Sequence, residues 1–98
     1  MVPVFPTWTK AGMVERVIYS HGMYRFNTRG IQLSVMMRYP SLKEDTPKLS
    51  TMRIRDTIQF VFRRLVEEER ITMVAKEKGR FTYQCVKDYS SISKDEFS

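Results

Sequence analysis

Basic side chains gather in two neighbouring segments of this chain, and their natural chemistry is the binding of a polyanion. Residues 50–69 carry four arginines away from an apolar face: Arg53, Arg55, Arg63 and Arg64. Lys76, Lys78 and Arg80 follow shortly afterwards. The whole chain has 17 Lys and Arg against 11 Asp and Glu, which gives a formal net charge of +6. This balance favours a polyanionic partner, although arginine-rich surfaces also occur on proteins with no anionic ligand.

The sequence lacks the groups that catalysis or metal binding would require. His21 is the only histidine and Cys85 the only cysteine, so neither an internal disulfide nor a multi-cysteine zinc site can form. We find no glycine-rich phosphate loop, no nucleophile with a nearby base and no paired carboxylates in a plausible pocket. We therefore expect a binding protein, not an enzyme, with no cofactor and no metal. Cys85 is expected to be a buried structural thiol, and His21 a polar residue at a helix end.

The first half of the chain predicts an arm, two helices and a short strand. At 98 residues with 42% hydrophobic content, the chain has room for one domain with a modest core. Residues 1–7 form a proline-bracketed arm that cannot be helical and should lie on the surface. The elements that follow are a helix capped by Thr7 or Thr9 and running to about Ser20, a short strand over 23–26, a helix capped by Asn27-Thr28 and running to about Tyr39, and a loop over 41–49.

The second half predicts a long third helix followed by a hairpin. Ser50 or Thr51 can cap the helix, which runs to about Glu69 and repeats apolar residues at helical spacing: Ile54, Ile58, Val61 and Leu65. The period then changes to two on either side of a turn over 76–79, so two strands are expected. Residues 87–98 are polar and serine-rich and are predicted to be a disordered tail.

The order of these elements resembles that of the winged helix-turn-helix superfamily of DNA-binding domains. Tyr24-Arg25-Phe26-Asn27-Thr28 leading to Ile31 is like the strand and cap that enter the second helix. Lys78-Gly79-Arg80-Phe81-Thr82-Tyr83 is similar to the glycine, basic and aromatic pattern of a wing tip. The remaining matches are the spaced core positions that lead from a recognition helix into a wing: Ile54, Ile58, Phe62, Leu65 and Ile71.

This resemblance covers roughly residues 8–86 and implies an α+β fold, mainly α, with three helices plus a C-terminal β-hairpin wing. The layout is also loosely like the winged-helix domain of adenine-methylation-dependent restriction enzymes, from which we carry over no methyl-adenine recognition. One position departs from the pattern, because the family usually has a glycine where this chain has Glu69 or Arg70. A left-handed turn without glycine costs about 1 kcal/mol, so we expect the third helix to end differently.

The resemblance further implies double-stranded DNA as partner and a role as transcriptional regulator, with helix 51–69 in the major groove and the 76–80 wing on the backbone. The implied base contacts come from the first half of the third helix: Met52, Arg53, Asp56 and Thr57. The implied phosphate contacts come from the second helix, the loop, the third helix and the wing: Arg29, Lys48, Arg55, Arg63, Lys76, Lys78 and Arg80.

A second interpretation is a winged-helix adaptor or inhibitor that binds a protein, for example a small viral or phage protein acting on a host nucleic-acid enzyme. Its interface would use Phe5, Trp8, Met13 and Phe60 as anchors. Phe5, Trp8 and Met13 could also hold a homodimer, while Trp8 could instead close the edge of the core. No run is long enough to span a membrane. We expect a cytoplasmic, nucleoid-associated protein, or a nuclear one in a eukaryotic host.

Overall fold

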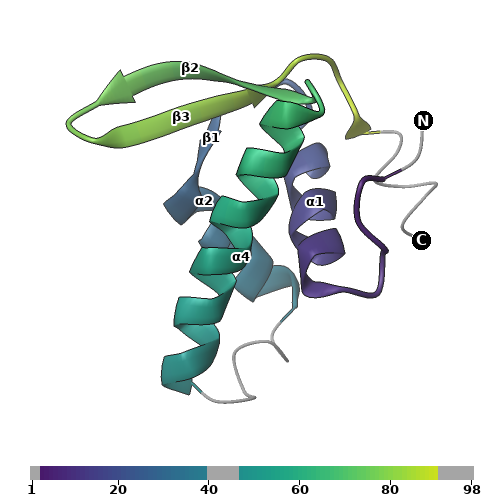
Figure 1. Cartoon of the computed structure of the whole chain (residues 1–98), viewed down its shortest axis with the longest axis vertical. Helices are drawn as coiled ribbons and strands as arrows, with labels where there is room; N and C mark the ends of the chain where they lie inside the picture. Colours follow the sequence, from purple (N-terminus) through teal and green to yellow (C-terminus); the bar gives the residue numbers. More distant parts are fainter. Residues whose placement is uncertain (1–2, 40–46, 91–98) are drawn as a thin grey trace.

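The computed structural model describes residues 3–39 and 47–90, with side chains from residue 54 onward in the second stretch. Within them the chain is an α+β domain with an antiparallel sheet (Figure 1), and this predicted class is confirmed. The elements are α1 (Lys10–Ser20), β1 (Phe26–Asn27), α2 (Thr28–Arg38), α4 (Pro47–Glu67), β2 (Ile71–Glu77) and β3 (Arg80–Cys85). None of the described helices is both long and apolar enough to cross a membrane.

The first two helices begin at side-chain caps that the sequence predicted. The Thr9 hydroxyl accepts a hydrogen bond from the backbone N–H of Gly12 at 3.0 Å. The side chain of Asn27 accepts one from the backbone N–H of Gly30 at 2.7 Å. Each bond satisfies an amide that the first helical turn leaves without a partner. Helix α1 ends at Ser20, His21 is its C-cap, and Gly22 follows with a φ of 58°, so the predicted ends of α1 are confirmed.

Helix α4 differs from its prediction at both ends. It begins at Pro47, so the predicted start at Ser50 or Thr51 is wrong, and residues 47–49 are helical where a loop was predicted; the rest of that predicted loop, 41–46, lies outside the described residues. Proline fits the first position of a helix because no intrahelical partner is lost there. At the other end Glu69 adopts a φ of 59°, so the expectation that this helix avoids a left-handed residue is also wrong.

The end of α4 is a Schellman motif built without glycine. The N–H of Arg70 donates to the carbonyl of Leu65 at 2.9 Å, and the N–H of Glu69 donates to that of Val66 at 3.0 Å. These two bonds satisfy carbonyl groups that the last helical turn would otherwise leave open. They offset the cost of placing a side chain in the left-handed region, and they direct the chain from α4 into β2.

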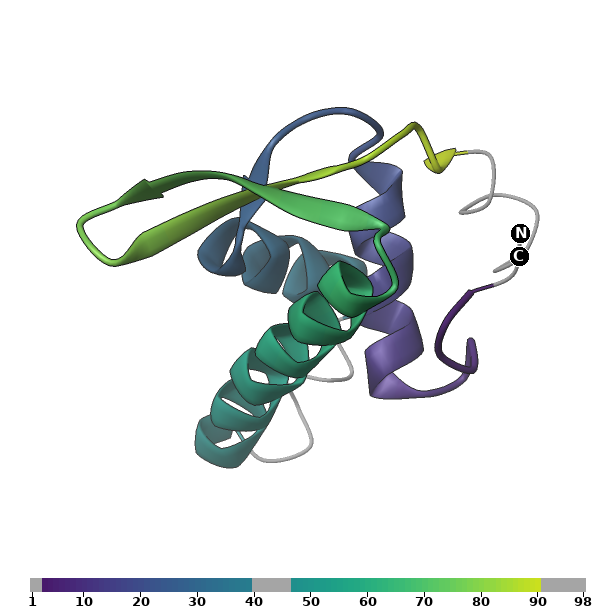
Figure 2. The ribbon, with the colours of Figure 1, turned by 45° about the horizontal axis from the view of Figure 1, so that its top comes forward.

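The strands form one sheet in the order β1-β3-β2. Strand β1 has only two residues where the sequence predicted four, and its Phe26 pairs with Tyr83 of β3. Strands β2 and β3 form a hairpin with an irregularity between Met73 and Ala75. The strands continue to Glu77 and resume at Arg80, so the turn is the two residues between them and not the predicted four. Figures 1 and 2 show this hairpin reaching past the helices to one side.

The core lies between the three described helices and the base of the sheet. Buried apolar side chains from each element meet there: Val14, Val17, Ile18, Tyr19, Phe26, Ile31, Val35, Ile54, Ile58, Val61, Phe62, Leu65, Ile71, Cys85 and Tyr89. Burial of Cys85 confirms its predicted position. Tyr89 corrects the predicted polar tail, because its ring is 2% exposed and lies 5.0 Å from that of Tyr19. Its aromatic surface therefore extends the domain beyond residue 86.

Candidate nucleic-acid interface

A basic cleft opens where three elements approach one another. It has a volume of about 480 Å³. The first turn of α2, the outer side of α4 and the tip of the β2–β3 hairpin each contribute to its lining, which consists of Asn27, Thr28, Arg29, Gln32, Arg55, Gln59, Gly79, Arg80 and Phe81. We call this set the basic cleft. Three of its nine residues are arginines and none is acidic, so its electrostatic field favours an anion.

Each element of the basic cleft supplies one arginine. Arg29 comes from α2, Arg55 from α4 and Arg80 from β3. All three are exposed, and none forms an ion pair with an acid of the described residues. The start of α2 adds partial positive charge because the peptide dipoles of a helix sum toward its N-terminus. The cleft can therefore hold phosphate groups through several charge-assisted hydrogen bonds.

The hairpin tip is fixed by its own turn chemistry. Lys78 and Gly79 both have positive φ values, 50° and 78°, as a two-residue type I′ hairpin turn requires. Lys76 places its Nζ 5.3 Å from the centroid of the Phe81 ring, and these two residues face each other across the strands. This cation–π contact holds the ring beside the tip.

The predicted phosphate-contacting residues divide into two groups. Arg29, Arg55 and Arg80 lie together in the basic cleft. Arg63, Lys76 and Lys78 are exposed but do not line it. The side chain of Lys48 lies outside the described residues, as do those of Met52 and Arg53.

The two predicted base-contacting residues whose side chains are described, Asp56 and Thr57, do not line the basic cleft. Thr57 is half-buried and is three residues from Phe60, so both share one flank of the helix. The Phe60 ring lies 5.7 Å from that of Phe5 in the N-terminal arm, which places this flank against the arm. Asp56 is exposed and outside the cleft lining. The side of α4 that faces α2 and the hairpin instead carries Arg55 and Gln59, one turn apart.

The four predicted protein-interface residues vary in exposure. Trp8 is 79% exposed, so the alternative in which its ring closes the core edge is wrong. Phe60 is 56% exposed, whereas Phe5 and Met13 are partly buried and pack against the core. Much of the apolar surface of Phe5 and Met13 is therefore already buried within the domain.

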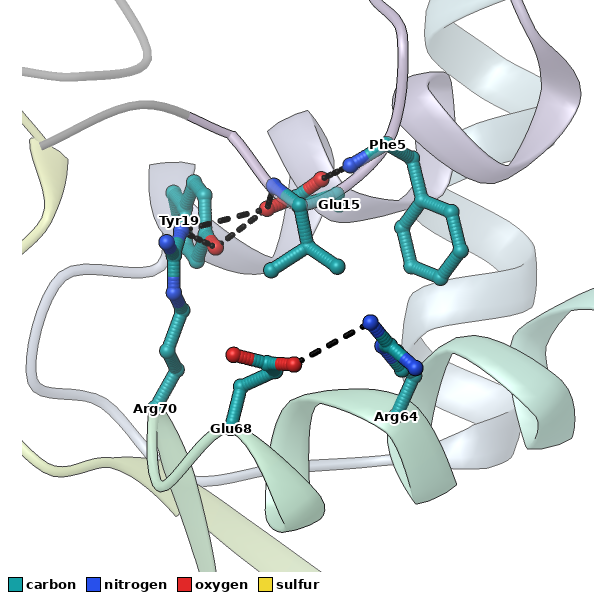
Figure 3. A network of polar contacts seen from close by, with 7 residues as sticks. Phe5, Glu15, Tyr19, Arg64, Glu68 and Arg70 are labelled. Atoms are coloured by element: carbon teal, nitrogen blue, oxygen red, sulfur yellow. Dashed lines mark hydrogen bonds and ion pairs between the residues drawn. The ribbon is translucent and has the colours of Figure 1, made fainter.

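A buried carboxylate, which the sequence reasoning missed, holds the arm in place (Figure 3). Glu15 is fully buried and accepts hydrogen bonds from the backbone N–H groups of Val4 at 2.8 Å and Phe5 at 2.9 Å. It also accepts one from the Tyr19 hydroxyl. The guanidinium of Arg70 lies 3.5 Å from the same carboxylate and donates to the Tyr19 hydroxyl at 2.8 Å.

This cluster satisfies a charge that burial would otherwise make very costly. Burial and the hydrogen bond to Glu15 raise the pKa of Tyr19, so its hydroxyl stays protonated. A sequence signal existed: Glu15 falls at helical spacing among Ala11, Ile18 and Tyr19, within an otherwise apolar face. An acid at such a position predicts a buried partner, but only the fold identifies that partner as Arg70.

Comparison of the chain with protein-family models, with curated proteins and with solved structures finds no match. In the described part of the chain, no three His, Cys, Asp or Glu side chains gather in the way a metal site would require.

Proposed function

We propose that this protein binds double-stranded DNA as a winged-helix domain, in which the β2–β3 hairpin is the wing. The observation that carries the proposal is the basic cleft, in which Arg29, Arg55 and Arg80 meet from three elements. Three separate cations on one surface suit successive phosphates of a nucleic-acid backbone. Helix α4 would lie in the major groove with the wing on the adjacent backbone.

The geometry changes which side of α4 we expect to face the duplex. Arg55 and Gln59 line the basic cleft, whereas Thr57 shares a flank with Phe60, which contacts the arm. Arginine can bond two acceptors of guanine, and glutamine can bond a donor and an acceptor of adenine. We therefore propose Arg55 and Gln59 as the groups of α4 nearest the DNA, a role that the resemblance assigned to neighbouring residues.

Fluorescence anisotropy with a random-sequence duplex at low and near-physiological salt tests the proposal. We expect affinity to fall steeply with salt because bound phosphates release their counterions. The triple variant Arg29→Ala/Arg55→Ala/Arg80→Ala should bind more weakly, and the slope of log K against log salt should decrease by about 3.

Arg64→Ala supplies the matched control. It removes the same charge from α4, but Arg64 pairs with Glu68 at 3.2 Å (Figure 3) and does not line the basic cleft. Arg64 follows Phe60 by one helical turn, on the flank that contacts the arm. Arg64→Ala should lower affinity much less than Arg55→Ala does. Equal losses from Arg64→Ala and Arg55→Ala would show that net charge, and not the basic cleft, drives binding.

A protein partner is the second candidate, and the exposure of Trp8 favours it. A tryptophan that is 79% exposed is the kind of aromatic anchor that protein interfaces bury. Absence of duplex binding even at low salt would support this candidate over DNA binding. Trp8→Ala should then abolish capture of the partner while leaving the fold intact.

A further inference from the structure

Phe81 gives the basic cleft an aromatic wall that phosphate binding alone does not require. Its ring is 39% exposed although it belongs to a large apolar side chain. Lys76 holds the ring from the cross-strand position, and Arg80 precedes it at the wing tip. An aromatic ring beside arginines is the combination by which proteins stack an unpaired base and bind its phosphate.

The size and polar groups of the cleft suit a single nucleotide. Its volume of about 480 Å³ lies within the range of roughly 300–1,000 Å³ that is typical of small-molecule sites. Gln32 from α2 and Gln59 from α4 line it, and each amide offers both donors and an acceptor to a base edge. None of the nine lining residues carries a negative charge that would repel a phosphate.

We propose that the basic cleft holds one unpaired nucleotide of a DNA strand. The base stacks on Phe81 and meets Gln32 or Gln59 with its edge, while the arginines of the cleft hold the phosphates on either side of it. This proposal rests on the proposed DNA binding, because the strand must first lie across α4 and the wing. It predicts tighter binding to duplexes that contain an extrahelical base, because a paired base inside the duplex cannot stack on Phe81.

The test compares three duplexes of one sequence: fully paired, with a single extra 2-aminopurine, and with an abasic site in place of that extra base. We expect the wild-type chain to bind the 2-aminopurine duplex about tenfold more tightly than the paired one, since stacking on an aromatic ring contributes about 1.4 kcal/mol or more. The abasic duplex should bind like the paired one. Stacking on Phe81 should also change 2-aminopurine fluorescence.

Phe81→Ala should remove the tenfold preference and the fluorescence change, where the preference is the ratio of the affinities of one variant for the 2-aminopurine and the paired duplex. Phe81→Trp should retain both. Phe60→Ala is the matched control, because Phe60 is also exposed on the surface but lies on the arm side of α4. It should keep the preference, and circular dichroism should show that all three variants are folded.

The outcomes separate this inference from the proposed function. If no duplex binds at any salt concentration, both fail. If paired and 2-aminopurine duplexes bind equally with unchanged fluorescence, the nucleotide site is refuted and duplex binding stands. A further experiment adds free dAMP as a competitor. Displacement of the 2-aminopurine duplex by dAMP at an equal concentration of nucleotide would refute a site specialised for a strand-borne base.

Discussion

Replacement of Glu15 by glutamine tests whether the buried carboxylate holds the arm and the end of α4 together. Glutamine has nearly the same shape but no charge, and its amide group donates where the carboxylate accepts. The two oxygens of Glu15 accept from the backbone N–H groups of Val4 and Phe5. In Glu15→Gln, the amide nitrogen faces the N–H of either Val4 or Phe5, and the orientation that faces Val4 also sets it against Arg70.

The expected loss is large because the site is dry. The side chain of Glu15 is 0% exposed and that of Arg70 is 13% exposed. Removing one partner from a buried ion pair typically costs about 3–5 kcal/mol, since the other charge remains without compensation. Arg70 sits at the edge of the cluster and can regain some water, so we expect about 3 kcal/mol. That is a large part of the roughly 5–15 kcal/mol that stabilises a typical domain.

Urea unfolding followed by circular dichroism measures this loss. Glu68→Gln provides the control, because it makes the same chemical change in an ion pair whose side chains are 49% and 41% exposed. Exposed pairs contribute about 0–1 kcal/mol. Amide exchange at Val4 and Phe5 reports on the arm itself and should accelerate only in Glu15→Gln. A Glu15→Gln protein within 1 kcal/mol of wild type, with both amides still protected, would refute the clamp.

Three further predictions concern stability. Glu69→Gly should raise the free energy of unfolding by up to about 1 kcal/mol in urea titrations, because glycine adopts the φ of 59° without strain. Gly12→Ala should lower it by about 1–3 kcal/mol despite the better helix propensity of alanine, since the added Cβ would lie 2.0 Å from the carbonyl oxygen of Pro6. Burial, helped by Asp88, raises the pKa of the Cys85 thiol from 9.0 to about 12. The folded state therefore keeps a proton that the unfolded chain loses, so stability should fall as pH rises from 9 towards 12, and Cys85→Ala should flatten that fall.

Local signals in the sequence were sufficient to place most elements. Thr9 and Asn27 are strong caps because their short side chains reach an amide three residues ahead. The start of α4 was misplaced because Pro47 reads as a loop residue, although proline is equally suited to a first helical position. The end of α4 was misjudged in a similar way. Glu69 adopts the left-handed conformation without being glycine, because the two hydrogen bonds to carbonyl groups of α4 outweigh the backbone cost.

Of the residues that line the basic cleft, the sequence singled out the three arginines, whereas Gln32, Gln59 and Phe81 were not among the predicted contacts. Arg29, Arg55 and Arg80 were each expected to contact phosphate from their place in the chain, but their meeting depends on how α2, α4 and the hairpin pack. Helical periodicity gives the angle between Arg55 and Thr57 around α4 and cannot say which of these residues faces the hairpin. That choice is made by the packing of the apolar stripe of α4 in the core, which leaves Arg55 at the cleft and brings Phe60 near Phe5 of the arm.

The direction of the hairpin, and with it the position of Arg80, is set at a junction remote from the basic cleft. At that junction Arg70 donates its N–H to Leu65, accepts a hydrogen bond from the N–H of Val86 at 3.0 Å, and extends its side chain to the cluster around Glu15. A small change of angle at this junction would displace the tip of the hairpin more than its base. Given the proposed DNA binding, Arg70→Met should therefore weaken binding to any duplex without removing a cleft residue. In the Arg70→Met background, Arg55→Ala should lower the duplex affinity by a smaller factor than it does in the wild-type chain.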